Sequence, residues 1–98
     1  MSNQIDRFGE YTLHRDEPRE WSVEGPNPDV RLSVQEDYHN GGPFVKVIAW
    51  SSAGGITPDD AADFGSEIIN ASQAAKYFTD VVRRPEYNER RWLYRLGL

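Results

Sequence analysis

Three aspartates close together are the residues of this sequence with the clearest potential chemistry. They stand in residues 56–63, ITPDDAAD, whose last five residues have the form D-D-x-x-D. Carboxylate oxygens are the ligands that Mg²⁺ prefers, and protein-bound Mg²⁺ often holds a phosphate group as well. The first question is therefore whether this stretch is a metal site or the beginning of a helix.

The same stretch contains what the start of a helix needs. Thr57 can accept a hydrogen bond from a free backbone N–H, and Pro58 suits the first helical position because its missing N–H costs nothing there. Asp59 and Asp60 then lie in the first turn, where the positive end of the helix dipole favours acids. Terpenoid synthases, which hold Mg²⁺ with D-D-x-x-D, add a second acidic motif inside a chamber of several hundred residues. A chain of 98 residues has no room for that chamber, so we expect a helix start and neither a metal nor a cofactor.

Other residues that could act in catalysis are scattered along the chain. We expect His14 and His39 to be solvated polar residues rather than acids, bases or ligands. Ser51 and Ser52 precede a small-residue loop, but no lysine follows and the acids at the helix start would repel phosphate. There is no cysteine and no G-x-S-x-G, H-E-x-x-H or G-K-[ST] motif. We therefore predict that the chain is not an enzyme and has no catalytic residues.

Length and composition are typical of one globular domain. A chain of 98 residues supports one modest core, and 38% hydrophobic residues are too many for a disordered chain. The N-terminus lacks the basic and apolar regions of a signal peptide, and no apolar run approaches the roughly 18 residues that span a bilayer. We expect a single domain over residues 1–98 that is cytoplasmic and contacts no membrane.

The charge is unevenly distributed along the chain. Residues 1–75 contain 13 acids and 5 bases, a net charge of −8, whereas residues 76–98 contain 3 acids and 6 bases, a net charge of +3. The acidic body argues against general binding to nucleic acid. The basic end keeps a local binding patch open as an alternative.

Alternating apolar and polar residues predict a sheet over residues 8–50, after a frayed segment 1–7. Asn40-Gly41 is a strong hairpin signal before the last strand because both residues tolerate positive φ. The four strands are expected at Phe8–His14, Glu20–Glu24, Val30–Glu36 and Phe44–Trp50.

From Pro58 the apolar residues recur at spacings of three and four, which predicts a long amphipathic helix over residues 57–84. Gly65 costs about 1 kcal/mol relative to alanine in such a helix, so we expect it to pack closely on the sheet. A short second helix is predicted over residues 85–96, before Gly97. The predicted fold class is α+β, a four-stranded antiparallel meander with the long helix packed on one face and a short C-terminal helix.

Two segments of the sequence point to partner binding. The strand Phe44–Trp50 is apolar on both faces except at Lys46, so it is covered on both faces or lies at an interface. In the C-terminal segment, arginines alternate with aromatic residues. This composition is typical of a protein interface or of a nucleic-acid contact. It is also expected if the aromatic residues cover the end of the core while the arginines extend into solvent. The residues that we predict to bind a partner are Phe44, Ile48, Trp50, Arg90, Arg91, Trp92, Tyr94 and Arg95.

The stretch VRLSVQEDYHNGGPFVKVIAWSSAGGITPDDAADFGSEIINASQAA, about half the chain, resembles small actinobacterial and actinobacteriophage proteins. These have a short antiparallel sheet, a turn and a helix that opens with L-T-P-x-E-A, where this chain has I-T-P-D-D-A. The chain departs from them at Phe64 and Gly65, where they tend to have Leu and Ala. Most of these proteins have no assigned activity, and small phage proteins of this kind often bind and alter a host protein.

The resemblance implies a phage-encoded, non-enzymatic protein that binds and modulates a host protein in the bacterial cytoplasm. It carries over no catalytic residues. Two other partners stay open from the residues themselves, namely a second copy of the chain in a homodimer and a nucleic acid bound by the C-terminal arginines and aromatics.

Overall fold

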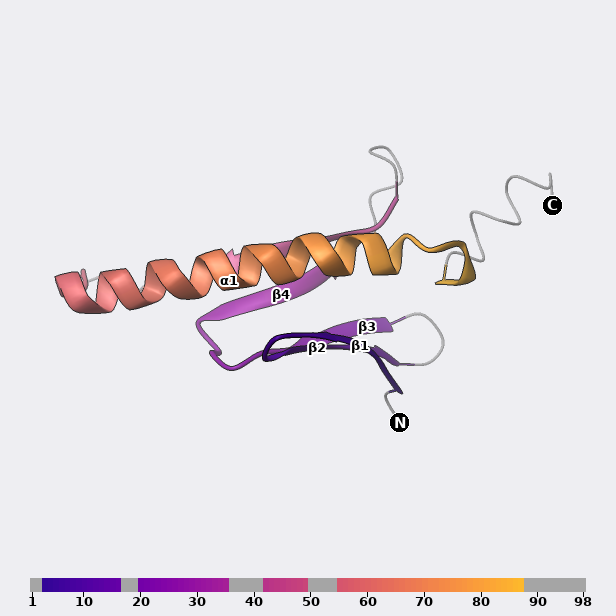
Figure 1. Cartoon of the computed structure of the whole chain (residues 1–98), viewed down its shortest axis with the longest axis horizontal. Helices are drawn as coiled ribbons and strands as arrows, with labels where there is room; N and C mark the ends of the chain where they lie inside the picture. Colours follow the sequence, from indigo (N-terminus) through magenta and orange to yellow (C-terminus); the bar gives the residue numbers. More distant parts are fainter. Residues whose placement is uncertain (1–2, 17–19, 36–41, 50–54, 88–98) are drawn as a thin grey trace.

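The computed structural model describes residues 3–16, 20–35, 42–49 and 55–87. Figure 1 shows a single long helix lying across a set of short strands. The elements in chain order are β1 (Asn3–Phe8), β2 (Tyr11–Asp16), β3 (Glu20–Glu24), β4 (Val30–Gln35), β5 (Phe44–Ala49), α1 (Pro58–Val82) and a 3-10 turn, η2 (Pro85–Tyr87).

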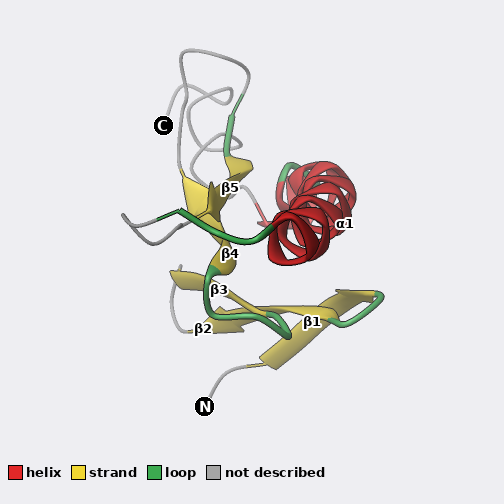
Figure 2. Cartoon of the chain, turned by 90° about the vertical axis from the view of Figure 1, so that its left-hand side faces the viewer, coloured by secondary structure: helices red, strands yellow, loops and turns green. Residues whose placement is uncertain are grey.

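The strands form two antiparallel sheets, β1-β2-β3 and β4-β5. Viewed along α1, the two sheets stand at an angle to each other and the helix fills the corner between them (Figure 2). The predicted α+β class is confirmed, but the single four-stranded meander is wrong.

The division between the sheets follows from the turn that joins β3 to β4. Residues 25–28, GPNP, contain two prolines, which have no N–H to donate to a strand ladder. Asn27 closes this turn, because its side-chain oxygen accepts from the Asp29 N–H at 2.9 Å and its carbonyl accepts from the Val30 N–H at 3.2 Å. The chain therefore changes direction here, and β4 pairs with β5 instead of β3.

The strand predicted over Phe8–His14 is in fact the junction of two strands. Gly9 has φ +59°, a conformation that glycine adopts without steric cost, and the chain turns there so that Phe8 pairs with Tyr11. Residues 3–7, which we expected to be frayed, belong to β1, and its Ile5 and Phe8 pack against the core.

Helix α1 begins as its sequence predicts. The Thr57 hydroxyl accepts a hydrogen bond from the Asp60 N–H at 3.2 Å, Pro58 is the first helical residue, and Asp59 and Asp60 lie in the first turn. Among the described residues no group of three or more acids and histidines is arranged to hold a metal ion. The D-D-x-x-D stretch thus serves as a helix start in this structure.

The end of the helical region differs from the prediction. α1 stops at Val82, with Arg83 as its cap. Of the second helix predicted over residues 85–96, the structure describes only the 3-10 turn Pro85–Tyr87, and residues 88–96 lie outside the described part of the chain. The proline at residue 85 interrupts the helix because it disfavours helical backbone in the residue before it.

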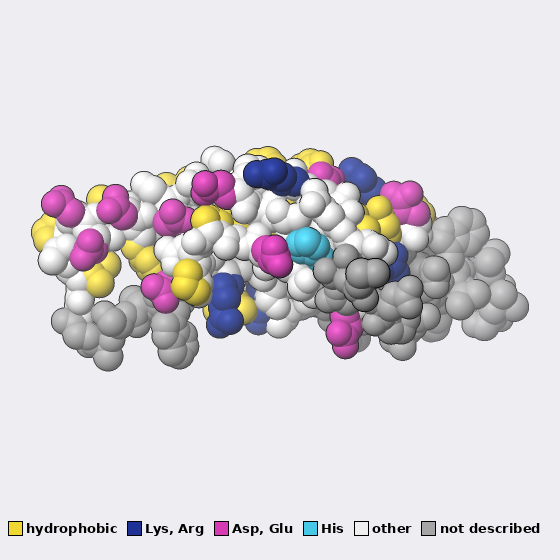
Figure 3. All heavy atoms as spheres, turned by 90° about the horizontal axis from the view of Figure 1, so that it is seen from below, with side chains coloured by type: hydrophobic (Ala, Val, Ile, Leu, Met, Phe, Trp, Pro, Cys, Tyr) yellow, Lys and Arg dark blue, Asp and Glu magenta, His cyan; other side chains and the backbone are white. Residues whose placement is uncertain are grey.

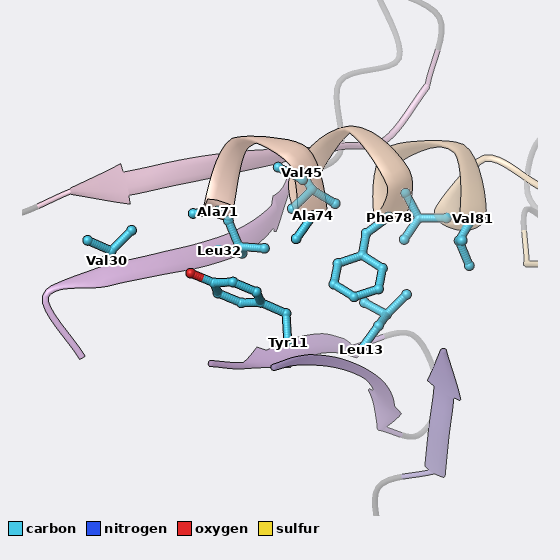
Figure 4. Close-up of a cluster of buried hydrophobic side chains, with 11 residues drawn as sticks. Tyr11, Leu13, Val30, Leu32, Val45, Ala71, Ala74, Phe78 and Val81 are labelled. Carbon is cyan, nitrogen blue, oxygen red and sulfur yellow. The ribbon is translucent and has the colours of Figure 1, made fainter. Parts of the chain in front are cut away.

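The core lies between the C-terminal half of α1 and the inner faces of both sheets (Figure 4). Two hydrogen bonds fasten α1 to β5 and its approach. The Val45 N–H donates to the Thr79 hydroxyl at 3.0 Å, and the Arg83 Nε–H donates to the Pro43 carbonyl at 2.8 Å. The buried core residues are Tyr11, Leu13, Val30, Leu32, Val45, Ala71, Ala74, Ala75, Phe78, Val81 and Val82.

Candidate functional site

The outer face of the β4-β5 hairpin is the most distinctive surface among the described residues. Val30, Leu32 and Val45 point into the core, so the alternate side chains of both strands point away from it. We call this outer surface the hairpin face. It is formed by Arg31, Ser33, Gln35, Phe44, Lys46 and Ile48.

Two predicted partner-binding residues lie together on the hairpin face. Phe44 and Ile48 are both half-buried, and neither belongs to the core cluster nor packs against it. Their direct cross-strand neighbours are Gln35 and Arg31. The face therefore presents two large apolar side chains beside polar ones. Because β5 has its other face in the core, as the sequence predicted, the strand is apolar on both sides.

The hairpin face is positively charged, although the chain has a net charge of −5. Arg31 lies opposite Ile48, and Lys46 lies opposite Ser33 on the neighbouring position of the ladder. The two bases are thus diagonal neighbours on the same surface. No member of the face is acidic, so their charges are not neutralised by the residues beside them on these strands.

Sequence reasoning missed Arg31 and Lys46 as members of this surface. The signal was partly present, because both residues belong to predicted strands, and the register of the hairpin then places Arg31 opposite Ile48. The loop length between the strands left that register open, and a one-residue slip would have moved every side chain to the other face.

The remaining predicted partner-binding residues cannot be placed on this surface. Trp50, Arg90, Arg91, Trp92, Tyr94 and Arg95 lie outside the described residues.

The described beginning of the C-terminal segment closes one end of the core. The Tyr87 ring meets the Trp21 ring edge-on, with centroids 5.4 Å apart. The Arg15 guanidinium lies 5.2 Å from the Trp21 centroid and 5.3 Å from that of Tyr87. At Tyr87, therefore, the interpretation of an aromatic residue sealing the core is correct.

His14 lies in the middle of the β1-β2-β3 sheet, on the face away from the core. Its side chain is 15% exposed, and its Nε2 lies 3.5 Å from an oxygen of Glu24. Both ring nitrogens are buried and neither makes a hydrogen bond, so the expectation that His14 is solvated is wrong. The surrounding residues do not form a metal-binding cluster within the described chain, and we assign His14 no chemical role. His39, Ser51 and Ser52 lie outside the described residues.

A shallow pocket of about 260 Å³ lies between the β1-β2 turn and one side of α1. Its wall includes Tyr11, whose hydroxyl is buried and has no hydrogen-bond partner. Burial, together with the negative charges of Glu67 and Glu10, raises the pKa of Tyr11 above its usual value of 10.0. Because the hydroxyl is shielded from solvent, the pocket does not present it to a ligand, and we place the candidate site on the hairpin face.

Comparison of this chain with protein-family models, with curated proteins and with solved structures finds no match. The resemblance to small actinobacterial and actinobacteriophage proteins therefore stays a prediction. Within the described residues, no helix has the length and apolar character to cross a membrane.

Proposed function

We propose that this chain is a non-enzymatic protein-binding domain and that the hairpin face is its binding surface. The observation that carries the proposal is the combination of Phe44 and Ile48 with the bases Arg31 and Lys46 on one face of the hairpin. The central residues of protein interfaces are typically aromatic, large apolar or arginine side chains.

The chemistry of the face defines the partner that it fits. Apolar side chains of the partner would cover Phe44 and Ile48 and remove them from water. Carboxylates beside those apolar groups would pair with Arg31 and Lys46. The partner segment is therefore amphipathic and acidic. If it comes from a host protein, as the resemblance implies, the same chemistry applies to that protein.

Affinity capture with a charge-reversed variant tests the proposal. The tagged full chain is mixed with an actinobacterial lysate, with and without nuclease, and the captured proteins are identified by mass spectrometry. We expect a stoichiometric protein that survives nuclease and is lost when Lys46→Glu is the bait. Lys76→Glu is the matched control, because it makes the same charge change at an exposed position of α1 away from the hairpin face.

Each result has a defined meaning. Capture that Lys46→Glu and Lys76→Glu weaken equally would reflect net charge and contradict a role for the hairpin face. Capture that disappears with nuclease would favour nucleic acid, which predicts a steep loss of affinity with salt. Both bait variants must first show the wild-type circular dichroism spectrum, and Lys46→Glu should keep it because a glutamate beside Arg31 forms a favourable diagonal pair.

A further inference from the structure

The N-terminal part of α1 extends beyond both sheets (Figure 1). The buried residues of the helix begin only at Ala71. We call residues 58–70 the projecting segment. Phe64 and Ile68 still pack against the edge of the core, but the rest of this segment is largely exposed to solvent. An exposed helix end of this length gains little stability from its own fold, because most helical stability in proteins comes from tertiary packing.

One side of the projecting segment is amphipathic and acidic. Asp59, Ala62, Asp63 and Ile69 recur at spacings that place them on the same side of a helix. Ile69 is 60% exposed, more than any other large hydrophobic residue of the described chain. Acidic side chains gather over this end of the molecule (Figure 3), and the segment contains four acids and no base.

Gly65 does not make the close packing on the sheet that the sequence predicted. A Cβ atom placed on Gly65 would have no neighbour within 4 Å. The monomer therefore does not require a glycine here, and the segment is free to approach another surface.

The projecting segment and the hairpin face complement each other. One offers Asp59 and Asp63 beside an exposed isoleucine, and the other offers Arg31 and Lys46 beside two half-buried apolar residues. Within one molecule they cannot meet, because β5 has its inner face against α1 and its outer face pointing away (Figure 2). The contact is therefore between two copies.

We propose that the occupant of the hairpin face is the projecting segment of a second copy of this chain. This inference rests on the proposed function, because it identifies the partner of the same face. Ile69 and Ala62 pack on Phe44 and Ile48, and Asp63 lies near Lys46. Each copy offers one segment and one face, so two such contacts close a two-fold dimer.

Charge reversal at each end of the contact tests the proposal. The oligomeric state of the full chain is measured by sedimentation equilibrium at low salt. The wild type is expected to dimerise. In Lys46→Glu, the new glutamate repels Asp63 in both contacts. In Asp63→Lys, the new lysine repels Lys46 in both contacts. Each variant alone should therefore raise the dimer dissociation constant at least about tenfold, whereas Lys76→Glu should not.

Mixing the Lys46→Glu and Asp63→Lys variants is the decisive experiment. In a mixed dimer, one contact joins Asp63 to Lys46 and the other joins the new lysine at 63 to the new glutamate at 46. Dimerisation should therefore return in the mixture, and also in the chain that carries both substitutions. Raising the salt concentration should weaken every dimer, because exposed ion pairs are screened.

Three results would overturn the inference. The first is a wild type that stays monomeric at about 100 times the concentration used for the capture that Lys46→Glu abolishes. The second is a dimer that Lys46→Glu does not weaken. The third is a mixture of the two variants that stays monomeric. None of them removes the proposed function, because the capture experiment tests that function separately. A helix-to-helix dimer would be recognised by insensitivity to Lys46→Glu combined with sensitivity to Asp63→Lys.

Discussion

Two tyrosine hydroxyls of this protein have opposite environments. The Tyr77 hydroxyl is exposed and donates a 2.7 Å hydrogen bond to Asp6, which links α1 to β1. The Tyr11 hydroxyl is buried and has no partner. A buried polar group without a hydrogen bond costs free energy, whereas a satisfied one contributes a little.

The substitution of each tyrosine by phenylalanine should therefore have opposite effects. Tyr11→Phe removes an unpaired hydroxyl and should leave the free energy of unfolding unchanged or raise it by up to about 1 kcal/mol. Tyr77→Phe removes the hydrogen bond to Asp6 and should lower the free energy of unfolding. Urea denaturation of both variants measures the difference. A marked loss of stability in Tyr11→Phe alone would contradict the absence of a hydrogen bond at this hydroxyl.

The same tyrosines should make the protein sensitive to alkali. Burial raises the pKa of Tyr11, and the hydrogen bond to Asp6 raises the pKa of Tyr77. A group whose pKa is higher in the folded state stabilises the fold below its unfolded pKa, here about 10, and loses that contribution as the pH rises through the folded pKa. The free energy of unfolding should thus fall above about pH 10.

This loss should become smaller in Tyr11→Phe and Tyr77→Phe and smallest in the double variant. Denaturation curves between about pH 8 and pH 11 provide the measurement. Equal pH dependence in all four proteins would contradict the assignment of the titration to these tyrosines.

Two glycines are predicted to differ when each is replaced by alanine. A Cβ atom at Gly25 would lie 2.6 Å from Cε1 and 2.8 Å from Cδ1 of the buried Tyr11 ring, so Gly25→Ala should cost about 1–3 kcal/mol. Gly65 has open space around it, so Gly65→Ala should stabilise the helix by roughly 0.5–1 kcal/mol. Thermal melting measures the loss at Gly25, and hydrogen exchange of the projecting segment measures the gain at Gly65. The prediction fails if Gly25→Ala melts no lower than the wild type.

At the scale of elements, α1 combines a packed part and a projecting part, and these should differ in local stability. Thr57→Ala removes the hydrogen bond from the Asp60 N–H, and such a cap is typically worth about 1 kcal/mol. Because the projecting segment has few buried contacts, its first turns should open locally without global unfolding.

Hydrogen exchange of the monomer measures this effect. Backbone amides of residues 61–66 should exchange faster in Thr57→Ala, while those of residues 74–82 and the melting temperature should hardly change. A melting temperature that falls as far as expected for the loss of a cap in a two-state protein would contradict the local opening.

The sequence predicted the start of α1 and the bounds of β3 well, because helix capping and alternation depend only on residues that are close together in the chain. Thr57, Pro58 and the two following aspartates begin α1 as expected, and β3 has the expected bounds of Glu20–Glu24. The turn at Gly9 was missed because Phe8 and Tyr11 also fit a continuous alternating strand, so periodicity alone did not show where the chain reverses.

At the scale of the whole molecule, the arrangement of the sheets depends on contacts that the sequence does not state. Nothing local shows that β3 and β4 belong to different sheets, or that α1 fills the corner between them. The candidate site shows the same limit. Phe44 and Ile48 were visible as apolar residues on a strand, but Arg31 joined them only through the hairpin register.

The central claim is that the hairpin face contacts a protein. Replacing Phe44 by the photoreactive amino acid benzoylphenylalanine places a probe on that face, and replacing the exposed Tyr77 places a control on α1. The full chains are illuminated in an actinobacterial lysate, and the mass of each adduct is measured after nuclease treatment. We predict an adduct at residue 44 that Lys46→Glu abolishes, with twice the chain mass of 11.2 kDa if the partner is a second copy, and none at residue 77. Equal adducts at both positions, or no protein adduct at residue 44, would contradict the account.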